Sequence, residues 1–184
     1  DSLTINTGSG DDSLLVSIGN PGNAFSGTVT LNAGAGQDSI DAALLTLPVS
    51  ITGGDGDDTL AGGSADDTLD GGDGTVTVVA AGDTNFTLTT AQLVSTATGT
   101  DALTAIEQAQ LTGGAGNNIL DATGFDGPTT LSGGDGDDSL FCSESPDVLN
   151  GGDGNDSLRG NGDSDSIFGD AGNDRLYGGA QSDL

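Results

Sequence analysis

A nine-residue repeat constrains the fold of this chain more than any other feature. From Gly133 onward the sequence divides into GGDGDDSLF, CSESPDVLN, GGDGNDSLR, GNGDSDSIF, GDAGNDRLY and the shorter GGAQSDL. Position six is Asp in every one of these repeats, and position eight is apolar in every complete one. Such self-similarity predicts stacked supersecondary units rather than one irregular core. Further repeats start at Thr7, Ala33, Gly53, Gly62, Gly71, Thr96 and Gly113.

Each repeat combines a turn with a short strand. The first six residues suit a turn, because Gly at positions one, two and four accepts a positive φ. The last three suit a short strand whose apolar residue points inward, such as Leu60. One Leu buries too little surface to order nine residues, so successive coils must stack in parallel. The pattern predicts an all-β fold in which parallel coils stack into a solenoid.

The charge balance limits the partners of the chain. It carries 29 acidic residues against two arginines, Arg159 and Arg175, and its formal net charge is −27. Two cations cannot neutralise a phosphate track, so nucleic acid is not an expected partner, and anionic membrane surfaces are disfavoured for the same reason. No apolar run is long enough to span a bilayer, which argues against membrane insertion. A chain this acidic must bind cations or stay unfolded.

The acidic residues are nearly all Asp, with Glu107 and Glu144 as the two exceptions. Asp holds its carboxylate near the backbone, where it can share a hard cation with main-chain carbonyls. Stacking would place the Asp of one coil roughly 4.8 Å from that of the next, a strongly repulsive arrangement unless a cation lies between them. Calcium fits, because it accepts six to eight oxygens with irregular geometry. The absence of His and the single Cys142 remove the usual ligands of zinc, copper and iron.

These residues resemble the nonapeptide repeat of the repeats-in-toxin (hemolysin-type) family, GGxGxDxUx with U apolar, which binds calcium. The resemblance is strong over 53–74 and 133–184, and the stretch GTDALTAIEQAQLTGG from Gly99 is similar to a lead-in segment of such arrays. It implies that two nonapeptides form one coil and that each calcium bridges successive coils. The repeats starting at 7, 33, 53, 71, 96, 113, 133, 151 and 169 are then expected on one edge. The resemblance thus implies a right-handed parallel β-helix or β-roll solenoid of about nine coils.

The resemblance also implies a set of ligands and about four to seven calcium ions. The pairs Asp12/Asp38, Asp38/Asp58, Asp138/Asp156 and Asp156/Asp174 are the sites we expect most. The degraded repeats starting at 142, 160 and 178 should hold calcium poorly on the opposite edge. Val76 and Asn118 replace the Asp of their repeats and should weaken those turns. The candidate metal ligands are Asp12, Asp38, Asp58, Asp67, Asp138, Asp156, Asp165 and Asp174, together with Gly53, Asp55, Gly133, Asp135, Gly151 and Asp153.

We expect residues 1–184 to form a single calcium-binding solenoid, an excerpt of a longer protein. It comprises a first repeat block (7–74), irregular coils (75–112) and a second block (113–184). A separate small β domain over 75–112 is the alternative. Cys142 is expected to be a buried thiol, with an intermolecular bridge as the other interpretation.

The predicted function is calcium binding by a secreted structural module. It would fold on meeting extracellular calcium and thereby support the export, through a type I channel, and the stability of a larger protein. Catalysis is not expected, because the chain has no His or Lys and its two arginines lie near one end. Adhesion to a glycan or ice surface, suggested by rows of Thr such as Thr28/Thr30, is the alternative function, and a disordered acidic linker is the alternative structure. A cell-surface glycan bound through other domains is the remaining partner considered.

Overall fold

The chain is built from short strands connected by tight turns. The computed structural model describes residues 1–17 and 25–183, and within these ranges it contains 19 strands and no helix. The described part of the chain therefore contains no helix that could cross a membrane. The first predicted block includes residues 18–24 and the second ends at Leu184, and these positions lie outside the described residues.

The strands belong to two compact units. Unit 1 consists of Asp1–Val79 and Thr98–Ile106, and unit 2 consists of Ala80–Ala97 and Glu107–Leu184. Residues 75–112 are thus divided between the two units and do not form a separate third one. The single continuous solenoid stays a prediction.

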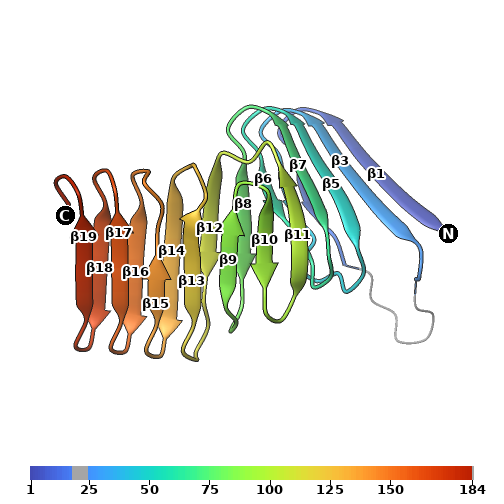
Figure 1. Ribbon diagram of the computed structural model, residues 1–184. Coiled ribbons are helices and arrows are strands. Elements are labelled where there is room, and N and C mark those ends of the chain that lie inside the picture. The colour runs from blue at the N-terminus through green and yellow to red at the C-terminus, as the bar shows by residue number, and fades with distance from the viewer. Residues whose placement is uncertain (18–24, 184) are drawn as a thin grey trace. The chain divides into compact units, whose positions relative to one another are not determined.

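Unit 1 is a roll of two parallel sheets, and Figure 1 shows the strands of the first sheet side by side. Buried apolar residues are in register, with Leu31 beside Ile51 and Ile51 beside Leu69. The first sheet contains β1 (Ser2–Ser9), β3 (Thr28–Ala35), β5 (Val49–Asp55), β7 (Thr68–Asp73) and β11 (Gly99–Thr104). The second contains β2 (Ser13–Leu15), β4 (Ser39–Asp41), β6 (Thr59–Ala61) and the first three residues of β8 (Thr77–Ala81).

Unit 2 repeats this architecture and adds one antiparallel hairpin. Its first sheet contains β10 (Gln92–Ser95), β9 (Phe86–Thr89), β13 (Ile119–Gly124), β15 (Ser139–Phe141), β17 (Ser157–Asn161) and β19 (Arg175–Gly179). Only β9 and β10 pair in antiparallel fashion among these. The second sheet contains β12 (Gln108–Thr112), β14 (Thr129–Asp135), β16 (Val148–Asp153) and β18 (Ser166–Ala171).

The apolar eighth position of the repeat forms the core, as the sequence predicted. Leu140, Leu149 and Leu158 are fully buried, and they stack in register on Leu158, Ile167 and Leu176 of the next coil. Leu176, in the last described coil, is 49% exposed. The all-β parallel β-roll architecture is therefore confirmed.

Three details of the prediction were wrong. Positions one to three of the best repeats continue the preceding strand, as Gly53 and Asp55 do in β5, so the turn is shorter than six residues. The regular repeats also do not all share one edge. Those starting at 7, 33, 53 and 71 end in the second sheet of unit 1, whereas those starting at 113, 133, 151 and 169 end in the first sheet of unit 2. The repeat starting at 96 does not lie on the edge of the repeat at 71. Instead Leu103 pairs with Leu69, which places it on the repeat that starts at Gly62. The surrounding sequence lacks the regular period, so it did not specify this register.

Candidate metal centres

Glycines at positions two and four determine the path of the turn. Gly54 and Gly56 have φ values of +116° and +132°, where any side chain would be strained. A Cβ at Gly54 would also overlap the carbonyl oxygen of Gly34 in the preceding coil, and one at Gly56 would overlap that of Gly36. Both positions need Gly for two reasons, backbone conformation and close approach of the coils.

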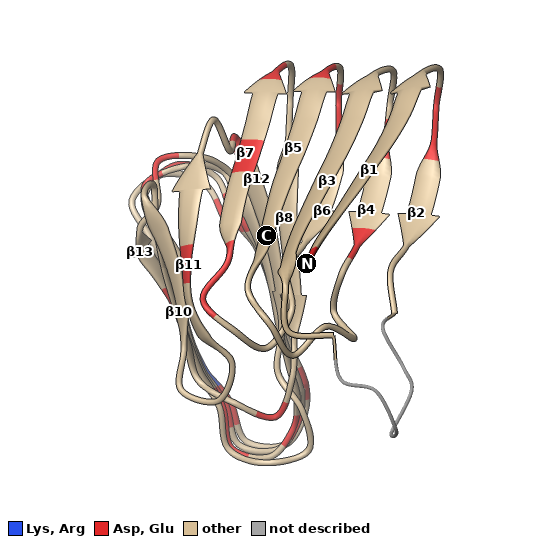
Figure 2. Cartoon of the chain, turned by 90° about the vertical axis from the view of Figure 1, so that its right-hand side faces the viewer, with Lys and Arg blue, Asp and Glu red and all other residues tan. Residues whose placement is uncertain are grey.

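The sixth-position carboxylates form a hydrogen-bonded ladder along the coils. Oδ1 of Asp38 accepts the main-chain N–H of Asp12 at 2.8 Å, and Oδ1 of Asp58 accepts that of Asp38 at 2.8 Å. In unit 2, Oδ1 of Asp156 likewise accepts the N–H of Asp138 at 2.8 Å, and Oδ1 of Asp174 accepts that of Asp156 at 3.0 Å. The structure therefore brings together all four residue pairs that the sequence placed side by side. Figure 2 shows how the acidic residues gather at the turns.

The second carboxylate oxygen is buried and lacks a partner. Oδ2 of Asp156 lies against Gly151, where an added Cβ would also approach the carbonyl oxygen of Gly169 in the next coil. The same arrangement surrounds Oδ2 of Asp58 and Asp138. An unsatisfied buried acceptor costs about 1–3 kcal/mol, and more when it is charged. Among the described residues, the oxygens in this state are Oδ2 of Asp12, Asp38, Asp58, Asp138, Asp156 and Asp165.

Burial disfavours the ionised form of these carboxylates. It is the main cause that raises the pKa of Asp58, Asp138 and Asp156, and the neighbouring carboxylates raise it further. The hydrogen bonds to Oδ1 oppose the shift without cancelling it. For Asp165 the pKa rises to about 6. These turns therefore lack a positive charge that would stabilise the ionised carboxylates.

The donor set fits a hard cation bound partly by the main chain. Within the described residues, no group of three or more His, Cys, Asp or Glu side chains is placed to hold a metal ion. Any bound ion would therefore take several ligands from carbonyl oxygens, such as that of Gly169, which lies near Gly151 together with Oδ2 of Asp156. An all-oxygen set with a high share of carbonyls suits calcium, whereas zinc and copper prefer nitrogen or sulfur ligands.

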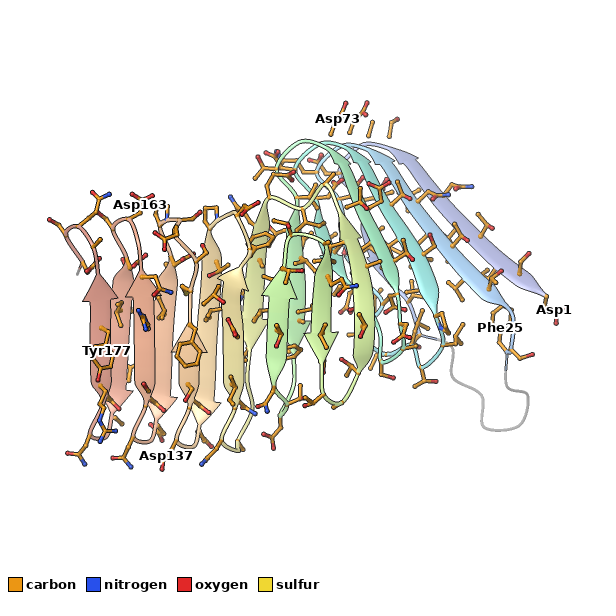
Figure 3. All side chains as sticks on the ribbon, in the orientation of Figure 1. Asp1, Phe25, Asp73, Asp137, Asp163 and Tyr177 are labelled. Carbon is orange, nitrogen blue, oxygen red and sulfur yellow. The ribbon has the colours of Figure 1, made fainter. Side chains whose placement is uncertain are left out.

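In each unit, the opposite edge carries a similar ladder of carboxylates with different hydrogen-bond partners. Oδ1 of Asp165 accepts the N–H of Asp147 at 3.0 Å, and Oδ1 of Asp101 accepts that of Asp67 at 3.0 Å. However, Oδ2 of Asp67 accepts the N–H of Gly63 at 2.6 Å, and Oδ2 of Asp147 accepts the Ser143 hydroxyl at 3.4 Å. These two oxygens already have protein partners, so we expect weaker metal binding at Asp67 and Asp147, whereas Oδ2 of Asp165 has no partner. Figure 3 labels Asp137 and Asp163, which lie at the two opposite turn edges of unit 2.

Two repeats have no Asp at position six and therefore no unpaired carboxylate there. Val76 occupies the Asp position of its repeat, and its side chain is buried beside Gly71. Oδ1 of Asn118 accepts the N–H of Gly114 at 2.7 Å, and its amide nitrogen donates to Asp83 at 3.3 Å. Val76 has no carboxylate and the Asn118 side chain is hydrogen-bonded, so neither turn presents the orphaned oxygen of the regular repeats.

The remaining predicted ligands divide into two groups. Gly53, Gly133 and Gly151 lie directly beside the orphaned Oδ2 of their own repeats. The third-position residues have exposed side chains outside the buried ladder, and these are Asp55, Asp135 and Asp153. Asp101, Asp147 and Asp183 also belong to the ladder, although the candidate ligands named from the sequence did not include them. The sixth position of each repeat was the signal that could have found them.

One family model matches the chain. The family model described as RTX calcium-binding nonapeptide repeat matches four segments, 50–78, 110–126, 123–158 and 150–184, which together cover more than half of the chain. No curated protein matches the sequence.

Proposed function

Because this chain belongs to the RTX calcium-binding nonapeptide repeat family, we propose that it is a secreted structural module that folds on binding extracellular calcium. RTX repeats bind calcium. The single observation that best supports extending this to specific residues is the row of buried, unpartnered Oδ2 atoms. Each of them is a buried acceptor that a calcium ion would satisfy.

The proposed ligands come from two sources. Oδ2 of the regular sixth-position residues, such as Asp38, Asp138 and Asp156, would supply negative charge. Carbonyl oxygens of the glycine-rich turns, such as that of Gly169 beside Asp156, would complete the shell. Calcium supplies the positive charge that offsets both the desolvation of the carboxylates and their mutual repulsion. We propose about four to seven ions, most firmly beside Asp12, Asp38 and Asp58 in unit 1 and beside Asp138, Asp156 and Asp174 in unit 2.

Folding and metal binding are linked in this proposal. The core is a thin column of Leu, Ile and Val, while the chain carries a net charge of −27. Without cations, self-repulsion and desolvated carboxylates oppose the little apolar burial that is available. Metal binding free energy then becomes folding free energy.

The calcium requirement suits an extracellular module. At low cytosolic calcium the chain would stay unfolded and suited to export through a type I channel, and millimolar calcium outside would fold it. Its role is structural and supports a larger protein, and we assign no catalytic step to it. The alternative of glycan or ice adhesion stays a prediction, and Thr28 and Thr30 on β3 lie in a different unit from Thr87 and Thr89 on β9.

A calcium titration followed by far-ultraviolet circular dichroism tests the proposal, with magnesium as the matched control. We expect a cooperative gain of β signal at sub-millimolar to millimolar calcium and a much smaller response to magnesium, which demands stricter octahedral geometry. A chain that is equally β-rich in excess chelator, or one that stays unfolded in calcium, would contradict the proposal.

A further inference from the structure

We propose that the outer face of β15, β17 and β19 in unit 2 is a binding site for an anionic saccharide. The central feature is a groove of about 610 Å³ lined by side chains of these three strands. This volume lies within the range typical of ligand sites, roughly 300–1,000 Å³. The lining residues are Phe141, Ser157, Arg159, Asn161, Tyr177, Gly178 and Gly179.

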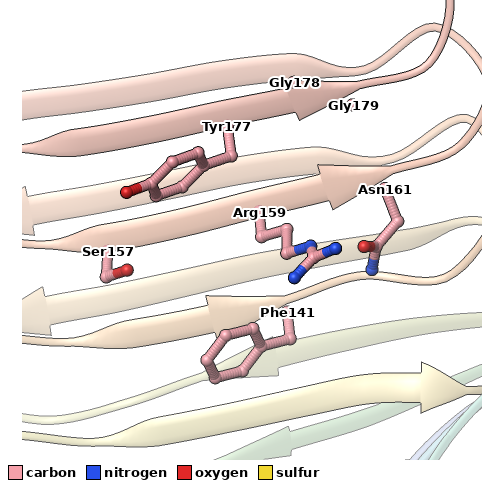
Figure 4. A pocket seen from close by; sticks show the side chains of 7 residues that line it. All are labelled: Phe141, Ser157, Arg159, Asn161, Tyr177, Gly178 and Gly179. Atoms are coloured by element: carbon pink, nitrogen blue, oxygen red, sulfur yellow. The ribbon is translucent and has the colours of Figure 1, made fainter.

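The strand register places an arginine between two aromatic rings. Phe141 pairs with Arg159, and Arg159 pairs with Tyr177, so the three side chains follow one another across adjacent strands. Figure 4 shows the guanidinium of Arg159 at a level between the two rings and extending toward Asn161. Tyr177 is 56% exposed and Phe141 is half-buried, so both rings are available at the surface.

The charge of this face sets it apart from the rest of the chain. Arg159 and Arg175 are the only two basic residues among 184, and both lie on these strands, where Ser157 beside Arg159 pairs with Arg175. Neither guanidinium makes a hydrogen bond or ion pair with any residue that the structure describes. Two unpaired cations on one face of a strongly acidic protein are complementary to an anionic ligand.

The groove chemistry indicates a sugar that carries carboxylate or sulfate groups. A guanidinium binds such groups through two parallel hydrogen bonds. Aromatic rings offer flat apolar surfaces to the C–H faces of sugar rings, and Phe141 and Tyr177 are two strands apart, roughly 9.6 Å. Ser157 and Asn161 add polar groups at either side of the row. A short stretch of an acidic polysaccharide would therefore occupy the groove, with an acid group on Arg159 and sugar rings on the aromatic side chains.

The test is calorimetric binding of a galacturonic acid tetramer to the calcium-loaded chain, with a neutral galactose tetramer for comparison. Protein and sugar are dialysed to the same free calcium. We expect the acidic tetramer to bind more tightly than the neutral one. Replacing Arg159 by Gln should weaken that binding by about 10- to 100-fold, as expected for the loss of hydrogen bonds to a charged group. Phe168→Ser is the matched control, because Phe168 is an exposed ring at the same repeat position on the other sheet, and it should leave binding unchanged.

Three outcomes would overturn the site. The acidic tetramer could fail to bind a chain whose dichroism shows it folded in calcium. Arg159→Gln could bind as tightly as the wild type, which would show that the sugar is bound elsewhere on the chain. An acidic peptide could bind with the Arg159 dependence while no sugar binds, which would assign the face to a protein partner. The dichroism of the same samples separates each of these from a failure of calcium-dependent folding.

Discussion

Replacing Asp156 by Asn should destabilise the folded chain in calcium and stabilise the folded chain without metal. Asp156 is fully buried, its Oδ1 accepts the N–H of Asp138 at 2.8 Å, and its Oδ2 has no partner. Asn keeps the size and one acceptor but removes the charge. The opposite signs in the two states are the core of the prediction, because a merely structural hydrogen bond would be lost equally in both.

The size of the effect in calcium follows from two losses. An ion lost at a free calcium concentration one hundred times its dissociation constant removes about 2.7 kcal/mol of stability. Exchanging a charged acceptor for a neutral one at the Asp138 N–H removes about 1 kcal/mol more. The calcium-bound variant should thus be about 3–4 kcal/mol less stable. Without metal, burial raises the pKa of Asp156, so removing the charge should favour folding.

The assay is a urea titration read by pulse labelling of the Cys142 thiol, which is fully buried in unit 2. It is run in saturating calcium, and in chelator with a stabilising osmolyte. Asp170→Asn is the control: it removes the same charge from an exposed side chain at a φ of 61°, a conformation that Asn tolerates. Equal losses in the two variants, or an Asp156→Asn loss of the same size with and without calcium, would refute the reasoning.

Three further predictions address the turns, the carboxylates and the thiol. Gly152→Ala should destabilise unit 2 by about 2 kcal/mol or more in urea unfolding, because φ at Gly152 is +103° and the new Cβ would overlap the carbonyl oxygen of Gly134. Gly82→Ala is the control and should be tolerated, because a Cβ at Gly82 would make only an ordinary contact. In metal-free buffer, the β signal in circular dichroism should rise on acidification from pH 7.5 toward 4. The pKa of Asp165 in the folded chain is about 6, above the ordinary 3.8. Protonation of Asp165 therefore stabilises the fold at low pH, and this stabilisation is lost as the pH rises through 6. A flat dichroism profile over this range would contradict it. Cys142 should react slowly with a thiol reagent in calcium and rapidly in chelator, because burial in the folded chain raises the pKa of the thiol and blocks access to it. Equal reaction rates would show that the fold does not depend on calcium.

Most of the fold and of the candidate site could be predicted from the nine-residue repeat, because its period determines which residues stack on one another in successive coils. The eighth position specifies the buried Leu column, as at Leu140 and Leu158, and the sixth specifies the carboxylate ladder, as at Asp138 and Asp156. These features depend on spacing alone. Stacking any two regular repeats 18 residues apart produces them.

The segment between the blocks could not be predicted in the same way. Residues 86–95 form the antiparallel pair β9 and β10, and the repeat at 96 lies on the repeat at 62. Here no glycine-rich turn fixes the register, so tertiary packing decides it. Nor does the spacing tell which Oδ2 atoms are satisfied: Asp67 and Asp165 hold the same repeat position, yet Oδ2 of Asp67 accepts the Gly63 N–H and Oδ2 of Asp165 is unpaired.

The most direct test of the central claim is anomalous diffraction from crystals grown in saturating calcium. The orphaned oxygens should then be ligands, so anomalous peaks should lie about 2.3–2.6 Å from Oδ2 of Asp138 and Asp156. Water or a protein donor at these oxygens, with no anomalous peak beside them, would contradict the account.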